Sequence, residues 1–184
     1  NGLPQAGSNK LSYAFDGLEN DTDRFPHDEY YRYIEKIDDL VAQEAARYIT
    51  DKGPDLSWVY LEYTDTVAHG YGDSDEFTSA IQRADNRVGQ IWKAILQREK
   101  NFNEDWLVVI TTDHGRDAET GKDHGAQSHR ERTIWVTTNS RDLNANFGKS
   151  TAIVDILPSI TTHMNISIKE PIKSQLDGHS FIGN

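Results

Sequence analysis

The sequence predicts an α/β fold in which a mainly parallel sheet carries helices on both faces. Segments with apolar residues at helical spacing alternate along the chain with short apolar runs typical of buried strands. This alternation favours parallel strands joined by right-handed crossovers. The chain has 184 residues, which is enough for one domain with a substantial core but hardly for two.

The first part of the chain contains a linker, a helix and a strand in the predicted order. Residues 1–26 hold scattered glycine, proline, asparagine and aspartate without a clear period, which indicates a linker. From Asp28 to Thr50 apolar residues recur every three or four positions, and this pattern predicts a helix that ends at Gly53-Pro54. The run Trp58–Tyr63 is aromatic and β-branched with little alternation, as expected of a strand covered on both faces.

The second part contains one long helix, two strands and a final helix. A helix is predicted over Asp73–Arg98, because a glutamate three residues after Asp73 gives capping-box spacing and a single apolar stripe follows. Trp106–Thr111 and Thr133–Thr137 are interpreted as two further buried strands, and Thr151–Met164 as a helix.

Composition and charge exclude several classes of protein. The chain is 36% hydrophobic and 27% charged, and it holds neither an apolar run long enough to span a membrane nor a signal-peptide pattern. Its net charge is −11, from 30 acidic and 19 basic residues, which argues against the nucleic-acid backbone as a partner. There are no cysteines, so disulfides and thiolate zinc sites are excluded.

Two of the predicted strands end in a carboxylate with a histidine nearby. Asp65 follows the first strand, and His69 comes four residues later, so a helical turn there would place both side chains on one face. Asp113 and His114 follow the next strand, and these adjacent side chains can bind the same ion only if the backbone bends sharply at Gly115. Ligands of open α/β sheets bind beyond the carboxyl ends of the strands, where both pairs lie.

Further histidines follow in the same loop. His124 could complete the set of ligands, whereas His129 lies beside Arg130-Glu131-Arg132 and fits a salt-bridged surface equally well. A single aspartate after a strand is more often a turn former, and a single histidine is more often solvated. Two such pairs at two strand ends, with a third histidine downstream, favour a metal site over these structural roles.

Four segments together resemble a known family. "YTDTVAHGYG" (63–72), "ITTDHGRD" (110–117), "GKDHGAQS" (121–128) and "LDGHSF" (176–181) are similar to segments of the alkaline phosphatase superfamily. The nearest branch is that of the nucleotide pyrophosphatase/phosphodiesterase-like enzymes, and the resemblance covers roughly residues 57–182. It implies an alkaline-phosphatase-like fold and metal-dependent hydrolysis of small phosphate esters, with a phosphodiester or pyrophosphate as the expected substrate.

The resemblance also implies a set of ligands for two divalent ions. Carried over position by position, Asp65, His69 and His124 would bind one ion. Asp113 and His114 would bind the second. Mixed carboxylate and imidazole ligation without sulfur suits zinc, with manganese as the alternative.

Two features of the family are not evident in the sequence: an aspartate at the end of a first strand, and a serine or threonine nucleophile at a helix start. We therefore expect residues 27–184 to be the C-terminal half of an alkaline-phosphatase-like catalytic domain, with residues 1–26 as a linker or the end of a cap region. The N-terminal half of the same enzyme would be the partner that supplies the nucleophile.

Two alternatives remain open from the sequence. The enzyme could be a phosphomonoesterase of the same superfamily. If the chain is complete, it could be a catalytically silent metal-binding or interaction domain. The expected location is extracellular or periplasmic, as is usual for such enzymes, and the glycosylation sequons at Asn20 and Asn165 agree with it.

Overall fold

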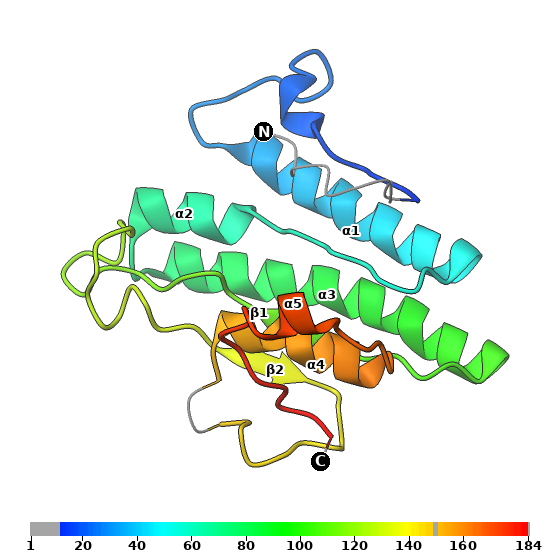
Figure 1. Cartoon of the computed structure of the whole chain (residues 1–184). Coiled ribbons are helices and arrows are strands. Elements are labelled where there is room, and N and C mark those ends of the chain that lie inside the picture. Colours follow the sequence, from blue (N-terminus) through cyan, green and yellow to red (C-terminus); the bar gives the residue numbers. More distant parts are fainter. Residues whose placement is uncertain (1–11, 149–150, 184) are drawn as a thin grey trace. The chain divides into compact units, whose positions relative to one another are not determined.

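The computed structural model describes residues 12–148 and 151–183, which form two compact units. Unit 1 consists of the described residues up to Val67 together with Ser74–Phe102, and unit 2 consists of Ala68–Asp73 together with the described residues from Asn103 onward. In chain order the elements are η1 (Leu18–Asn20), α1 (Arg32–Lys52), α2 (Tyr63–Tyr71), α3 (Asp75–Phe102), β1 (Val109–Thr111), β2 (Val136–Thr138), η2 (Ile153–Asp155), α4 (Ile156–His163) and α5 (Glu170–Lys173) (Figure 1). Among the helices of these described residues, none is both long and apolar enough to cross a bilayer.

Helix α1 confirms the first predicted helix. The Asp28 carboxylate accepts the N–H of Tyr30, which lies just before the helix, and that of Arg32, the first helical residue, and so satisfies one donor of the helix start. The helix ends at Gly53, whose φ of 55° is left-handed and whose N–H donates to the carbonyl of Ile49. Glycine adopts this conformation without the steric cost that a side chain would add.

The core of unit 1 lies where α1 and α3 pack together. Its buried side chains are Phe25, Tyr33, Ile34, Tyr63, Val67 and Ala80. Phe25 belongs to the segment predicted as a linker, but it is only 5% exposed, so the chain before α1 packs on this core. Arg87 of α3 is also buried and donates from Nε to Asp39 of α1 over 2.7 Å.

Helix α3 confirms the second long helix but not its predicted cap. Ser74 is the capping residue, because its Oγ accepts the N–H of Phe77 over 3.1 Å. Asp73 instead forms an ion pair with Arg130, with both carboxylate oxygens 2.7 Å from the same guanidinium nitrogen. The predicted capping box at Asp73 is therefore wrong.

The strand predicted over Trp58–Tyr63 is also wrong. Residues 58–62 have no regular secondary structure, and Tyr63 is already the first residue of α2. Trp58 is 89% exposed, although the pattern indicated burial on both faces. Aromatic and β-branched residues fit a strand only where neighbouring strands cover them, and no strand in the described residues pairs with this segment.

The sheet of unit 2 has two strands and is antiparallel. Val109 lies opposite Thr138, and Thr111 lies opposite Val136. The predicted mainly parallel sheet with helices on both faces is thus not what the described residues form. The physical reason is the connection: residues 112–135 contain no helix, and a parallel pair needs a crossover that this loop does not provide.

The C-terminal part of unit 2 is anchored on α4. Helices η2 and α4 together confirm the helix predicted over residues 151–164. The fully buried Ser159 hydroxyl accepts the N–H of Phe181 over 2.9 Å, and the carboxylate of Asp155 accepts the N–H of His179 over 2.7 Å. These two bonds fix the closing segment of the chain against α4.

Candidate metal centre

Helix α2 presents Asp65 and His69 one turn apart. Its start is fixed by Asp38, whose two carboxylate oxygens accept the N–H groups of Glu62 and Tyr63, each over 3.0 Å. Asp38 is 2% exposed, and this burial raises the pKa of its carboxyl group, whereas the two N–H bonds lower it. Because residues four apart share a face of a helix, Asp65 and His69 project on the same side of α2.

The bend after β1 depends on Gly115. Its N–H donates to the carbonyl of Glu131 over 2.7 Å, and a Cβ at this position would lie 2.0 Å from the carbonyl oxygen of Arg130. Only glycine allows this close approach of two backbone segments. The predicted bend therefore has a cause that the sequence did not reveal, namely a backbone contact with residues 130–131.

The His114 imidazole is held in one tautomer by the same bend. Its Nδ1 lies 2.9 Å from the carbonyl of Gly115, and since a carbonyl can only accept, Nδ1 carries the proton. The lone pair of Nε2 is then available to a metal ion. The Asp113 carboxylate is exposed and lies 3.6 Å from this Nε2 atom.

The loop that carries His124 is organised around Asp117. The Asp117 carboxylate accepts the N–H groups of Glu119, Thr120 and Asp123 and the hydroxyl of Thr120, over 2.7 to 2.9 Å. These bonds, first that from the Thr120 N–H, hold the pKa of Asp117 well below its usual range. The loop is thereby closed immediately before His124.

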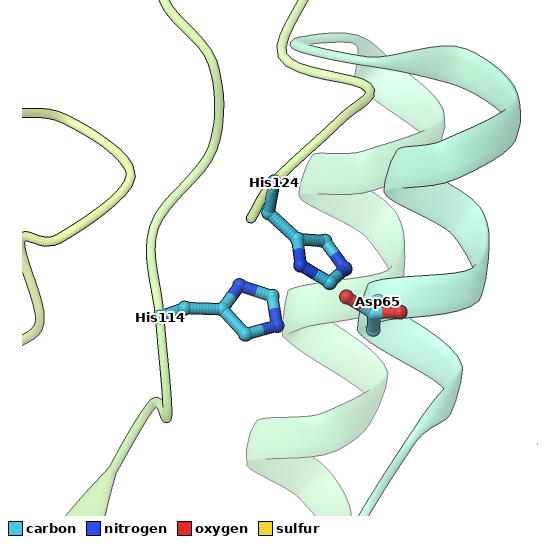
Figure 2. Close-up of side chains that lie close together, drawn as sticks. All are labelled: Asp65, His114 and His124. Atoms are coloured by element: carbon cyan, nitrogen blue, oxygen red, sulfur yellow. The ribbon is translucent and has the colours of Figure 1, made fainter. Parts of the chain in front are cut away.

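Three imidazoles converge within unit 2. The Nε2 atoms of His69 and His124 lie 3.1 Å apart, and the rings of His114 and His124 stack with centroids 3.8 Å apart. The ligand nitrogens of His114 and His124 lie within 4.8 Å of each other. Figure 2 shows these two imidazoles side by side.

This arrangement fits a divalent ion. Two nitrogens bound to one tetrahedral zinc ion lie roughly 3.3 Å apart, close to the separation of the His69 and His124 Nε2 atoms. Oxygen and nitrogen donors without thiolate suit zinc, and manganese as the second choice. His114 is half-buried and His124 is exposed, so the imidazole cluster is open on one side, as catalytic metal sites are.

Of the five residues predicted as ligands, unit 2 brings together four, namely His69, Asp113, His114 and His124, and Asp65 lies one turn before His69 on α2. The resemblance assigned His114 to a different ion from His124, whereas the two rings are stacked in the structure. The division of the five ligands between two ions therefore stays a prediction. His129 is placed differently: it lies in the same loop, but the carbonyl of His129 accepts the hydroxyl of Thr133 over 2.7 Å, and its ring is not part of the cluster.

Sequence reasoning missed two residues that organise the centre, Asp117 and Glu131. Glu131 stands between two arginines, which indicated an exposed salt-bridged face, but it is 5% exposed and bonds to the backbone. An acidic residue that binds local N–H groups leaves no periodic signal in the sequence. The only local hint was the number of glycines and short polar residues around it.

Comparisons with known proteins identify the family. The family model for type I phosphodiesterase/nucleotide pyrophosphatase matches residues 9–172. The chain belongs to this family. Membership confirms the resemblance to the alkaline phosphatase superfamily and implies the α/β fold of this family, whose members typically depend on metal ions.

The related proteins are distant and longer. The chain is 27% identical over 138 residues to a phosphopentomutase of Acetivibrio thermocellus, a match that covers 74% of the chain and 31% of that protein. It is 35% identical over 65 residues to venom phosphodiesterase 2 of Crotalus adamanteus, which covers 35% of the chain and 8% of that enzyme. A venom phosphodiesterase of Naja atra is 32% identical over 68 residues. No solved structure matches the chain.

Proposed function

We propose that this chain supplies part of the two-metal site of a hydrolase that cleaves small phosphodiesters or nucleotide pyrophosphates. The observation that carries the proposal is the convergence of the imidazoles of His69, His114 and His124 within unit 2. Asp65 precedes His69 by one turn of α2 and supplies a carboxylate on the same helical face. Membership in the type I phosphodiesterase/nucleotide pyrophosphatase family supplies the reaction class.

The chemistry of the cluster agrees with this reaction. Divalent ions held there would bind and polarise phosphoryl oxygens, and would offset the repulsion between the phosphate and a chain of net charge −11. The carboxylates of Asp65 and Asp113 contribute negative charge that favours a cation. The hydrogen bond from the Nδ1–H of His114 to the Gly115 carbonyl orients the ring, so that Nε2 is its ligating atom. Zinc is the proposed ion.

The partner we propose is a further segment of the full-length enzyme, its N-terminal half. The matched segments cover 31% of the phosphopentomutase and 8% of venom phosphodiesterase 2, and the sequence of the chain contains no evident nucleophile. Leu56 is 62% exposed and Trp58 is 89% exposed, in a segment with the composition of a buried strand. Such side chains are normally covered, so they are candidates for contact with the proposed N-terminal half.

The test is turnover by the full-length enzyme with and without a chelator. We expect hydrolysis of bis-p-nitrophenyl phosphate to exceed that of p-nitrophenyl phosphate and to be abolished by chelation. His124→Ala should lower turnover about 100-fold or more, because developing charge on the phosphoryl oxygens loses its cation. His163→Ala is the matched control, since His163 lies 3.1 Å from the carbonyl of Asp105 and outside the cluster.

The alternatives give different outcomes. A preference for the monoester would indicate a phosphomonoesterase, and isomerisation of a pentose phosphate would indicate a mutase like the Acetivibrio protein. Chelator-insensitive turnover would overturn the metal-dependent mechanism. Zinc binding without any turnover would support the alternative that the chain is a catalytically silent metal-binding domain.

A further inference from the structure

Glu131 contacts both histidine-bearing segments of the loop between β1 and β2. The loop spans residues 112–135 and has no helix or strand of its own. His114 lies near its start and His124 near its middle, ten residues apart, yet their rings stack at 3.8 Å. Something other than regular secondary structure must hold these two segments at a fixed separation.

The side chain of Glu131 binds the segment that follows His124. Its Oε1 accepts the N–H of Ala126 over 2.9 Å, and its Oε2 accepts the N–H of Ser128 over 3.1 Å. These two N–H groups follow Gly125 by one and three residues, and at Gly125 φ is 101° and the chain turns away from His124. The carboxylate therefore fixes the exit of the His124 turn.

The main chain of Glu131 binds the segment that follows His114. Its carbonyl accepts the N–H of Gly115 over 2.7 Å, and the neighbouring carbonyl of Arg130 lies against the Gly115 Cα. Glu131 thus contacts both histidine-bearing segments: its backbone carbonyl binds the segment after His114, and its carboxylate binds the segment after His124. Both contacts lie within unit 2.

Glu131 is buried and ionised. It is 5% exposed. A hydrogen bond from the Ser128 hydroxyl, followed by the two backbone bonds, lowers the pKa of its carboxyl group below the ordinary value. Charge-assisted bonds from backbone N–H groups to a carboxylate are stronger than neutral ones, which suits a residue that must keep a loop in one conformation.

We propose that Glu131 is a positioning residue: it holds the His124 turn against the His114 bend so that both imidazoles can ligate the same metal cluster. The inference rests on the proposed metal-dependent function. It assigns no contact between Glu131 and the metal or the substrate. Residues that orient metal ligands through hydrogen bonds typically change metal affinity or activity about 10- to 100-fold when they are replaced.

The test compares Glu131→Gln with Glu119→Gln in the full-length chain. Glutamine keeps the shape of Glu131 but presents an amide group to one of the two N–H donors, so one bond is lost. Glu119 lies in the same loop and its side chain is exposed, which makes it a matched control for the loss of charge. Zinc affinity is measured by competition with a chromogenic chelator, and folding is measured by thermal melts in excess chelator.

We expect Glu131→Gln to weaken zinc binding about 10- to 100-fold and Glu119→Gln to leave it within twofold. Nitrogen-15 spectra of the imidazoles should also show that the His114 and His124 resonances no longer shift together on addition of zinc. Full zinc affinity in folded Glu131→Gln, even with a lowered melting temperature, would overturn the positioning role. If the parent itself binds no zinc, the proposed function fails instead, and the two failures are thereby distinguished.

A second variant covers the case in which Glu131→Gln does not fold. Ser128→Ala removes the hydroxyl that bonds to the Glu131 carboxylate and leaves both backbone bonds in place. It should weaken zinc binding in the same direction but less, by about 2- to 10-fold, since only part of the anchor is lost. An unchanged affinity in Ser128→Ala would count against the proposal.

Discussion

The Nε2 atoms of His69 and His124 lie 3.1 Å apart, although 55 residues separate the two histidines along the chain. This distance suits either a shared proton or a shared metal ion. The ring of His114, stacked on His124, favours the metal, and so does the carboxylate of Asp65 one turn before His69 on α2, since each adds a further ligand beside the two nitrogens. Measurement of zinc affinity distinguishes a shared metal ion from a shared proton.

We predict that His69→Ala and His124→Ala each lower zinc affinity, by at least about 10-fold, because each removes one ligand from the same cluster. His129→Ala should leave it within twofold, as this side chain contacts Thr133 instead. Isothermal titration calorimetry at constant pH gives the affinities. A loss in His129→Ala with no loss in His124→Ala would show that the ligand has been misassigned.

Gly115→Ala should destabilise unit 2. The added Cβ would meet the carbonyl oxygen of Arg130 at 2.0 Å, and relief of this overlap requires a shift of the backbone. We expect a loss of about 1–3 kcal/mol of unfolding free energy, the usual range for an overpacked site, measured by urea denaturation. The same substitution at Gly89 is the control: nothing lies within 4 Å of that position, and alanine in the interior of α3 should stabilise by about 0.5–1 kcal/mol.

Asp38→Ala should destabilise the start of α2. The substitution removes the acceptor of the Glu62 and Tyr63 N–H groups at a position that is 2% exposed. Leaving buried donors without an acceptor typically costs about 1–3 kcal/mol. Denaturant titration of this variant, beside the exposed Asp85→Ala of α3, provides the measurement. Equal stability of the two variants would contradict the capping role of Asp38.

Asp117 should give the loop a characteristic dependence on pH. Its folded-state pKa lies below the ordinary value of 3.8, so the ionised group stabilises the fold above that pH. This contribution is lost as the pH falls through the depressed folded-state pKa. We therefore expect Asp117→Asn to melt at a lower temperature than the parent at neutral pH, and the difference to shrink toward zero in strong acid. A difference that grows with acidity would contradict the assignment.

Local features of the site could be predicted from the sequence, whereas long-range ones could not. The i, i+4 spacing of Asp65 and His69 correctly placed both on one helical face, because helix geometry depends only on neighbouring residues. The stacking of His114 on His124 depends on bonds from Asp117 and Glu131 to backbone N–H groups. These bonds follow no period in the sequence and become visible only in three dimensions.

The fold shows the same division. The helices predicted from apolar periodicity are present as α1, α3 and α4, since amphipathic spacing is strong over many residues. The prediction of a strand over Trp58–Tyr63 was wrong, because aromatic and β-branched residues form a strand only where neighbouring strands cover them. The predicted parallel direction of the strands was also wrong. Direction depends on the connection between two strands, and residues 112–135 join β1 to β2 without a helix. The division at residue 27 and the extracellular or periplasmic location stay predictions.

The hydrogen bonds that hold the His124 loop have a kinetic consequence. Most of residues 117–128 are exposed, so polar bonds to Asp117 and Glu131, rather than apolar packing, keep the loop closed. Segments held in this way open locally without unfolding the rest of the protein. A bound ion would then depart when the loop opens, and the lifetime of those bonds would set its residence time. Replacement of one metal by another would accordingly be limited by release of the first ion and not by capture of the second.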